Sequence, residues 1–199
     1  DDYKWFINRL RSMANLFDVI RIDHFRGLAS YWSIPYNETT AKNGKWIKGP
    51  DMGLIKALHR ELPDTEFIAE DLGYLTPEVI ALREGSGFPG IKVLEFAFDA
   101  REKSDYLPFT YIANSVCYAA THDNEVLVQW QKVIPPEDRN KVERYFGLAK
   151  DTDLRMPILR AGIASVSYLF VAQLQDYIGL GAESRMNRPG TSDGKNWLW

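Results

Sequence analysis

Short apolar runs alternate with helical patterns along most of this 199-residue chain. The runs DVIRID, EFIAEDLG, IKVLEFAF and NSVCYAATHD read as strands, and LFVAQLQD at 169–176 is either a fifth strand or a helix. Strands that alternate with helices predict a parallel sheet, which is covered by helices on both faces. The sequence therefore predicts an α/β fold, and a parallel barrel or an open doubly wound sheet would both fit.

The helical patterns have recognisable ends. Apolar spacing predicts helices over 3–17, 54–62, 137–146 and 156–166. Thr76 and Pro77 predict the start of a further helix that ends at Gly85. The stretch 27–50 is rich in Gly, Pro, Asn and aromatic residues and predicts a long loop, while 91–98 reads as one strand. A chain of this length is expected to build one sizeable core.

Composition excludes several kinds of partner. The formal net charge is −3 and the chain has no Lys/Arg block, so neither nucleic acid nor an anionic membrane is an expected partner. No apolar run reaches the roughly 20 residues of a transmembrane helix. Cys117 is the only cysteine. It cannot form an internal disulfide, which fits a reducing compartment, and we expect a cytoplasmic protein.

Acidic residues stand at the ends of three predicted strands. Asp23 ends the first strand, Glu70 the second and Asp123 the fourth. In a parallel α/β structure the carboxyl ends of all strands lie on one face, so the three acids are expected to converge. Arg21 precedes Asp23 by two residues, so both point to the same side of the strand. A guanidinium in that position holds the carboxylate ionised and oriented.

Paired carboxylates that face a neutral substrate indicate glycoside chemistry. A retaining mechanism uses one carboxylate as nucleophile and one carboxylic acid as proton donor, about 5–5.5 Å apart. Asp23, beside Arg21, suits the nucleophile. Glu70, which follows an apolar strand and precedes another acid, suits the general acid/base. Asp123 is expected to bind hydroxyls of the distorted sugar ring.

Other residues near these strand ends can contact a sugar. His24 directly follows Asp23, and His122 directly precedes Asp123. Both can donate hydrogen bonds to the same sugar hydroxyls. The predicted loop supplies aromatic rings for the apolar faces of sugars, namely Tyr31, Trp32 and Trp46.

Two alternatives remain open at this point. A lone aspartate at a strand end is commonly a turn or helix cap, so each acid alone has a structural explanation. Alternatively, Asp23, His24, His122 and Asp123 could ligate a metal in a hydrolase, although the chain contains no H-x-H or H-x-x-x-H pair. No Gly-rich phosphate-binding motif follows any strand. We therefore expect no cofactor and no metal.

Several motifs, in the same order, resemble a known family. VIRIDHFRG, GPDMGLIKAL, FIAEDLG, GFPGIKVLEFAF, THDN and the tail LQDYIGLGAESRMNRPGTSDGKNWLW are similar to the 4-α-glucanotransferases. These enzymes of the α-amylase clan are also called amylomaltases or disproportionating enzymes. The resemblance covers essentially the whole chain. Ala120 and Glu125 depart from the Gly and Asp that usually flank the THDN motif.

The resemblance implies a (β/α)8 barrel enzyme that moves segments of α-1,4-glucan between chains. By motif, Asp23 matches the nucleophile, Glu70 the acid/base and Asp123 the aspartate that stabilises the transition state. The expected substrate contacts are Arg21, His24, Trp46, Asp71, His122 and Asn124. The expected partners are α-1,4-glucans and maltooligosaccharides.

Residues 1–199 are expected to form the C-terminal part of that barrel, with about the last five of its eight strands. Five strands leave two unpaired edges, which favours self-association or closure by a missing N-terminal piece. We therefore expect the isolated chain to be inactive. The residues do not separate transfer from hydrolysis, so a retaining glucan hydrolase and a non-catalytic glucan-binding fragment remain as alternatives.

Overall fold

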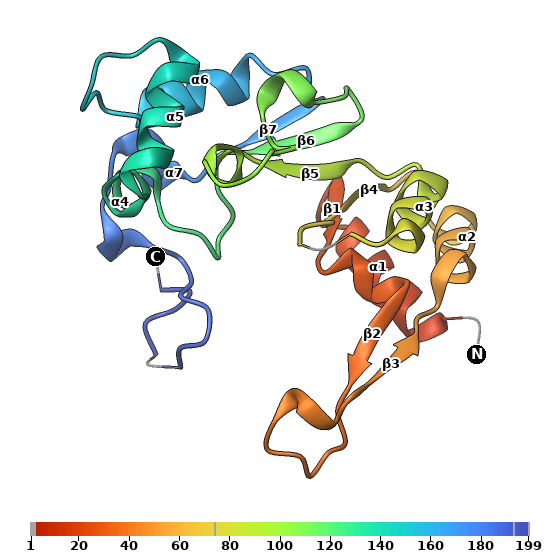
Figure 1. The fold of residues 1–199 in the computed structure, drawn as a ribbon. Helices are drawn as coiled ribbons and strands as arrows, with labels where there is room; N and C mark the ends of the chain where they lie inside the picture. The colour runs from red at the N-terminus through yellow and green to blue at the C-terminus, as the bar shows by residue number, and fades with distance from the viewer. Residues whose placement is uncertain (1–2, 74, 193, 199) are drawn as a thin grey trace. The chain divides into compact units, whose positions relative to one another are not determined.

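The computed structural model describes residues 3–73, 75–192 and 194–198. The chain forms two compact units, Asp1–Ile91 and Lys92–Trp199. Each unit contains its own hydrophobic core, whereas the length of the chain predicted a single one. Five parallel strands run through the fold in the order β1-β4-β5-β6-β7 (Figure 1), with β5, Gly90–Val93, at the boundary between the units.

The first unit packs three helices against parallel strands. β1 pairs in parallel with β4, with Ile22 opposite Ala69, and β4 pairs in parallel with β5. Buried Ile20, Phe25 and Leu58 contribute to its core. The elements of this unit are α1 (Lys4–Ala14), β1 (Val19–Ile22), η1 (Phe25–Leu28), β2 (Ser30–Ser33), η2 (Ala41–Asn43), β3 (Lys45–Lys48), α2 (Asp51–Glu61), β4 (Glu66–Ala69) and α3 (Pro77–Ser86), where η denotes a 3₁₀ helix.

The second unit contains the parallel pair β6 and β7, with Cys117 opposite Phe170. Its core gathers Phe98, Leu127 and Ile158, all buried. The elements are η3 (Leu94–Phe98), η4 (Pro108–Thr110), β6 (Ser115–Tyr118), α4 (Leu127–Val133), α5 (Pro136–Phe146), α6 (Arg155–Ile163), β7 (Leu169–Val171), α7 (Leu174–Ile178) and η5 (Ala182–Ser184).

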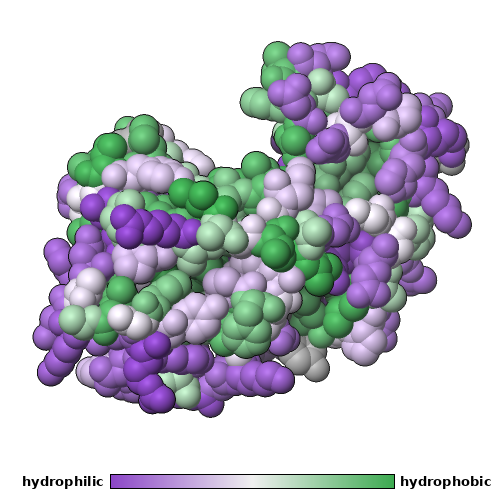
Figure 2. All heavy atoms as spheres, turned by 90° about the horizontal axis from the view of Figure 1, so that it is seen from above, coloured by the Kyte–Doolittle hydropathy of each residue, from purple (hydrophilic) through white to green (hydrophobic). Residues whose placement is uncertain are grey.

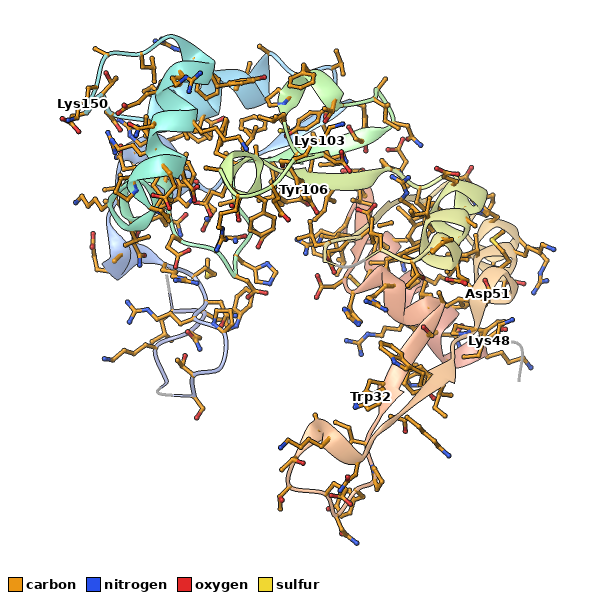
Figure 3. All side chains as sticks on the ribbon, viewed as in Figure 1. Trp32, Lys48, Asp51, Lys103, Tyr106 and Lys150 are labelled. Carbon is orange, nitrogen blue, oxygen red and sulfur yellow. The ribbon has the colours of Figure 1, made fainter. Side chains whose placement is uncertain are left out.

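The predicted loop at 27–50 contains an antiparallel hairpin. β2 and β3 pair with Trp32, which Figure 3 labels on the hairpin, opposite Trp46. The two indole rings meet edge to face, with their centroids 5.4 Å apart. Gly44 permits this approach, because a Cβ there would lie 2.2 Å from the Trp32 ring. Each strand has only four residues, and cross-strand aromatic pairs stabilise such ribbons. The sequence analysis missed these two short strands because the Gly and Pro residues around them indicate a loop.

Several predicted boundaries also differ from the structure, among them the ends of the helices predicted over 3–17 and 156–166, which stop at Ala14 and Ile163. The strand predicted over 91–98 ends at Val93 and continues as η3. The segment 169–176 divides into β7 and the start of α7, so both interpretations of it were partly right. α3 begins at Pro77 as predicted, but Gly87 at φ 74° ends it instead of Gly85, because the left-handed conformation favours glycine.

The surface mixes polar and apolar side chains. Large apolar residues such as Trp5, Phe109 and Leu198 are exposed, and green and purple residues are interspersed on the face seen in Figure 2. Scattered apolar residues of this kind are normal on a protein surface. None of the helices in the described residues has the length and apolar character that a membrane span requires.

Candidate active site

Arg21 and Asp23 meet at the carboxyl end of β1, as the strand period predicted. Ile20 and Ile22 point into the core, which leaves Arg21 on the opposite face. An Nη of Arg21 donates to Oδ1 of Asp23 at 2.7 Å. The Asp23 side chain remains 70% exposed while Arg21 is 22% exposed. The guanidinium therefore orients a carboxylate that is still open to a ligand.

Glu70 leaves the sheet beside Asp23. Ile22 and Ala69 are partners across β1 and β4, so the residues that follow them lie on adjacent strands, roughly 4.8 Å apart along the hydrogen-bonding direction. Oε2 of Glu70 accepts from the backbone N–H of His24 at 2.5 Å, and Oε1 accepts from that of Leu72 at 3.0 Å. The structure thus brings together two of the three predicted acids.

The backbone conformation at His24 accompanies the hydrogen bond from its N–H to Glu70. His24 adopts a left-handed conformation at φ 49°, which is uncommon for a residue with a side chain. The main chain of Glu70 donates to the carbonyl of Ile22 at 3.0 Å and accepts from the N–H of Phe25 at 2.9 Å. The turn after β1 is therefore fastened to the end of β4 by both backbone and side-chain bonds.

Asp71 has structural partners in this arrangement. Its side chain is buried, Oδ1 accepts from the N–H of Ile91 at 2.8 Å, and Oδ2 lies 3.5 Å from Arg83. Gly90 is needed beside it, because a Cβ there would lie 2.5 Å from Oδ2. These contacts join the end of β4 to the start of β5. The role of Asp71 as a substrate contact stays a prediction.

Among the aromatic residues predicted to bind sugar, Trp46 lies on the hairpin with half of its surface exposed. The guanidinium of Arg26 lies over its ring at 5.1 Å from the centroid. Trp32 donates through its indole N–H to the carbonyl of Ala41 at 2.8 Å, which ties it to the hairpin. Tyr31 is also partly exposed. The hairpin therefore presents Trp46 more freely than Trp32.

Asp123 belongs to the second unit and has its own set of partners. Its Oδ1 accepts from Nδ2 of Asn187 at 2.6 Å, and Nε2 of His122 lies 3.5 Å away. Arg185 donates to the main-chain carbonyl of Asp123 at 2.6 Å and to the carboxylate of Glu125 at 2.7 Å. The segment after η5 therefore holds both the backbone and the side chain of Asp123.

Asn124 and His122, the neighbours of Asp123 that were predicted to bind substrate, make different contacts. Oδ1 of Asn124 accepts from the N–H and the hydroxyl of Thr121, at 3.0 and 2.6 Å, in a local turn. The ring of His122 lies 5.1 Å from that of Trp197. Arg185 and Asn187 were not predicted as site residues. Their only sequence signal was the ESRMNRPG segment within the tail that resembles the family.

The whole of this chain, residues 1–199, matches the family model described as 4-alpha-glucanotransferase. The chain is 41% identical to the 4-alpha-glucanotransferase of Clostridium butyricum, over all of this chain and 41% of that protein. It is 43% identical to the 4-alpha-glucanotransferase of Synechocystis sp., over 99% of this chain and 39% of that protein.

The chain belongs to the 4-alpha-glucanotransferase family. The resemblance inferred from the motifs is thereby confirmed. The chain spans about two fifths of the length of the curated relatives it matches.

Solved structures agree with this family membership. The amylomaltase from Streptococcus agalactiae in complex with acarbose superposes with a TM-score of 0.92 at 37% identity, over 100% of this chain and 40% of that one. The amylomaltase from Corynebacterium glutamicum, at 20% identity and a TM-score of 0.77, shares the fold. The predicted fold class is confirmed, an α/β fold of the TIM-barrel type of which the described residues form five parallel strands.

The described residues contain no group of three or more His, Cys, Asp or Glu side chains that could hold a metal ion. The metal-dependent alternative gains no support from this arrangement of the described residues.

The buried carboxyl groups of the second unit include Glu95 and Asp176. Oδ1 of Asp176 accepts from the N–H of Leu127 at 2.7 Å. Oε1 of Glu95 and Oδ2 of Asp176 are buried without a hydrogen bond among the described residues. Burial, with the carboxylates of Asp176 and Glu125, raises the pKa of Glu95 well above its usual value. Burial raises the pKa of Asp176 to about 6.

The raised pKa of Asp176 predicts a stability effect. The folded protein holds this proton up to about pH 6, whereas the unfolded chain releases it near the ordinary aspartate value of about 4. The free energy of unfolding therefore decreases as the pH rises from about 4 to 6, and it stays lower above that range. Asp176→Asn removes the titrating group and with it this pH-dependent loss of stability. The difference in free energy of unfolding between the variant and the parent should therefore grow by on the order of 2 kcal/mol from pH 4 to pH 7.

Urea unfolding of both proteins at several pH values measures this difference. Asp153→Asn is a suitable control, because the side chain of Asp153 is half exposed. A stability difference between Asp176→Asn and the parent that does not change with pH would contradict the expectation.

Proposed function

We propose that the natural gene product carrying this sequence is a 4-alpha-glucanotransferase that moves α-1,4-glucan segments to the 4-hydroxyl of an acceptor glucan or glucose. The observation that carries the proposal is the pair Asp23 and Glu70 at the ends of adjacent parallel strands, with Arg21 bound to Asp23. Adjacent parallel strands lie roughly 4.8 Å apart, and a retaining mechanism uses two carboxyl groups about 5–5.5 Å apart, so neighbouring strand ends suit such a pair. The acarbose complex of the related amylomaltase supports a glucan-like ligand.

In the first step of the proposed mechanism, a carboxylate oxygen of Asp23 attacks the anomeric carbon of the donor. The bond to the glycosidic oxygen breaks, and Glu70 gives its proton to that oxygen, which leaves as the 4-hydroxyl of the released segment. The product is a glucosyl ester on Asp23. Splitting one difficult displacement into two easier ones is the advantage of a covalent intermediate.

In the second step the 4-hydroxyl of the acceptor attacks the same carbon and gives its proton to Glu70. The ester bond to Asp23 breaks, and two inversions leave the α-configuration unchanged. Asp123 is proposed to stabilise the oxocarbenium-like transition state, and Asn187 and Arg185 support it in that position. His24, Asp71, His122, Asn124 and Trp46 are proposed as substrate contacts.

Incubation of the natural gene product with maltotriose tests the reaction type. Transfer gives glucose together with oligosaccharides longer than maltotriose. Hydrolysis gives only shorter products, because water replaces the acceptor hydroxyl in the second step. Chromatography of the products separates these outcomes, and the absence of longer oligosaccharides at high maltotriose concentration would contradict a transferase.

The same assay on the 199-residue chain tests whether five strands suffice. We expect turnover at least a hundredfold below that of the natural gene product, because a closed barrel needs eight strands and excludes water from its site. Size-exclusion chromatography reports whether the chain associates through its open sheet edges. Comparable turnover from a monomeric 199-residue chain would refute the expectation.

A further inference from the structure

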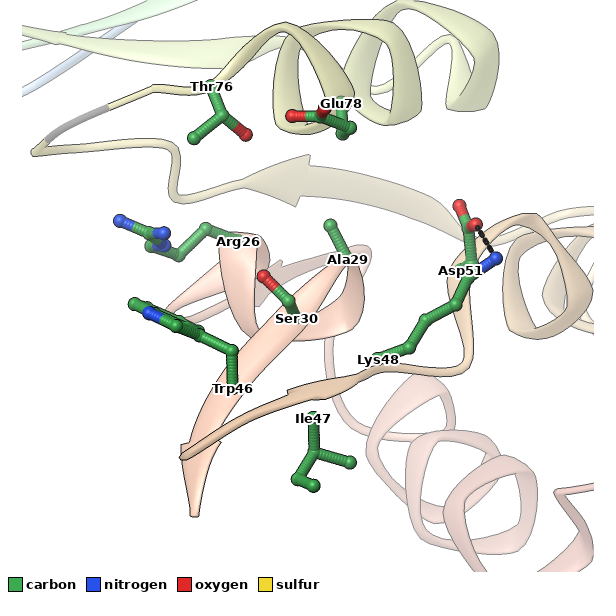
Figure 4. Close-up of a pocket in the computed structure, with 9 residues that line it drawn as sticks. All are labelled: Arg26, Ala29, Ser30, Trp46, Ile47, Lys48, Asp51, Thr76 and Glu78. Carbon is green, nitrogen blue, oxygen red and sulfur yellow. Dashed lines mark ion pairs between the residues drawn. The ribbon is translucent and has the colours of Figure 1, made fainter. Parts of the chain in front are cut away.

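The β2–β3 hairpin forms one wall of a pocket of about 600 Å³ within the first unit. This volume falls within the roughly 300–1,000 Å³ typical of small-molecule sites. Figure 4 shows Trp46 and Lys48 on the hairpin side and Thr76 and Glu78 on the opposite side, at the start of α3. Arg26 reaches in beside Trp46.

The hairpin wall is held in place by backbone contacts. The N–H of Gly49 donates to the carbonyl of Ala29 at 2.8 Å, which joins the base of β3 to that of β2. A Cβ on Gly49 would lie 2.2 Å from the carbonyl oxygen of Leu28, so only glycine permits this approach. The edge-to-face pair of Trp32 and Trp46 fixes the ring direction. The pocket is therefore preformed, as ligand sites usually are.

The formal charges around the pocket cancel. Arg26 and Lys48 are cationic, Asp51 and Glu78 are anionic, and Lys48 pairs with Asp51 at 3.2 Å (Figure 4). A phosphate group would face two carboxylates, and a cationic ligand would face two basic groups. A neutral ligand with many hydroxyls suits this wall, because it needs both donors and acceptors. The exposed indole of Trp46 offers a surface to the apolar face of a sugar ring.

The pocket adjoins the turn that carries the candidate catalytic groups. Arg26 follows Asp23 by three residues, in the 3₁₀ helix whose first residue, Phe25, donates to the carbonyl of Glu70. We propose that this hairpin pocket binds a segment of the α-glucan chain beyond the sugar that reacts with Asp23. The inference rests on the glucan transfer proposed above, and it adds a binding site for the chain on the hairpin side.

Binding of maltoheptaose and maltotriose by calorimetry tests the pocket in the natural gene product. An Asp23→Asn background prevents turnover during the titration. Adding Trp46→Ala should weaken maltoheptaose binding about tenfold, equivalent to ~1.4 kcal/mol, and should weaken maltotriose binding less. Trp5→Ala is a matched control, because Trp5 is also exposed with a guanidinium, that of Arg9, over its ring at 5.7 Å.

A second variant separates stacking from folding. Trp46→Phe keeps a ring at the same position, so its affinity for maltoheptaose should stay within threefold of the parent even if Trp46→Ala fails to fold. Glu78→Gln should weaken binding a few-fold, because it removes a charged acceptor from the opposite side. Unchanged affinity in Trp46→Ala and Glu78→Gln would overturn the proposal. Equal losses for maltotriose and maltoheptaose would also overturn it, because Trp46 would then act at the reacting sugar.

The binding assay does not depend on turnover, so it can be read separately from the transfer reaction. Selective loss of maltoheptaose binding in a protein that shows no transfer would leave the pocket in place and reject the transferase. Active transfer with unchanged binding in Trp46→Ala would reject the pocket alone.

Discussion

Asp23→Asn in the natural gene product is expected to abolish glucan transfer, with turnover reduced by at least about a thousandfold. An amide oxygen is a far weaker nucleophile than a carboxylate and cannot form the glucosyl ester. The fold should tolerate the change, because the Asp23 side chain is 70% exposed and its hydrogen bond from Arg21 can still be accepted by the amide oxygen. Glucan binding should therefore remain largely intact.

The measurement is glucose release from maltotriose, paired with calorimetric binding of maltoheptaose. Asp18→Asn is the matched control, because Asp18 is an exposed aspartate at the opposite end of the same strand. It should retain turnover within about twofold. Residual activity of Asp23→Asn within tenfold of the parent would exclude Asp23 as the nucleophile.

Glu70→Gln is expected to reduce transfer from maltotriose by roughly 10²–10⁴, the usual contribution of a general acid/base. The glutamine oxygen can still accept one of the two backbone N–H bonds that the carboxylate receives from His24 and Leu72. It cannot donate a proton to the glycosidic oxygen or take one from the acceptor hydroxyl.

A donor with an activated leaving group distinguishes this role from a structural one. Fluoride leaves α-maltosyl fluoride without being protonated, so the first step should be far less impaired in Glu70→Gln than with maltotriose. An initial burst of fluoride release reports this step. Glu66→Gln, at the amino end of the same strand, serves as the control. Equal losses with both donors would indicate that Glu70 supports the site without transferring a proton.

Local pattern was enough to locate Asp23 and Glu70 directly after β1 and β4, whereas the fourth predicted strand ends at Tyr118 and Asp123 lies in the turn that follows it. Runs of buried apolar residues mark strands, and a strand that leaves a sheet must end in residues that tolerate water. The two-residue period also predicted the contact between Arg21 and Asp23, which the structure shows at 2.7 Å. The structure adds the pairing of β1 with β4, which places Glu70 beside Asp23.

Other features depended on contacts between distant residues. The hairpin of β2 and β3 depends on the Trp32–Trp46 pair and on the close approach of Gly49 to Leu28, which no local pattern encodes. Arg185 and Asn187 reach Asp123 from more than 60 positions along the chain.

The sequence by itself determined the strand and helix alternation, the family and the positions of the acids, because these depend on residue type and short-range period. Only the tertiary structure decided what surrounds them. Asp71 accepts a hydrogen bond from Ile91, and Glu95 is buried without a hydrogen-bond partner for Oε1 among the described residues. A pocket lies beside Trp46. The physical reason is that burial and hydrogen-bond partners are set by packing between segments, and packing is not a property of any one segment.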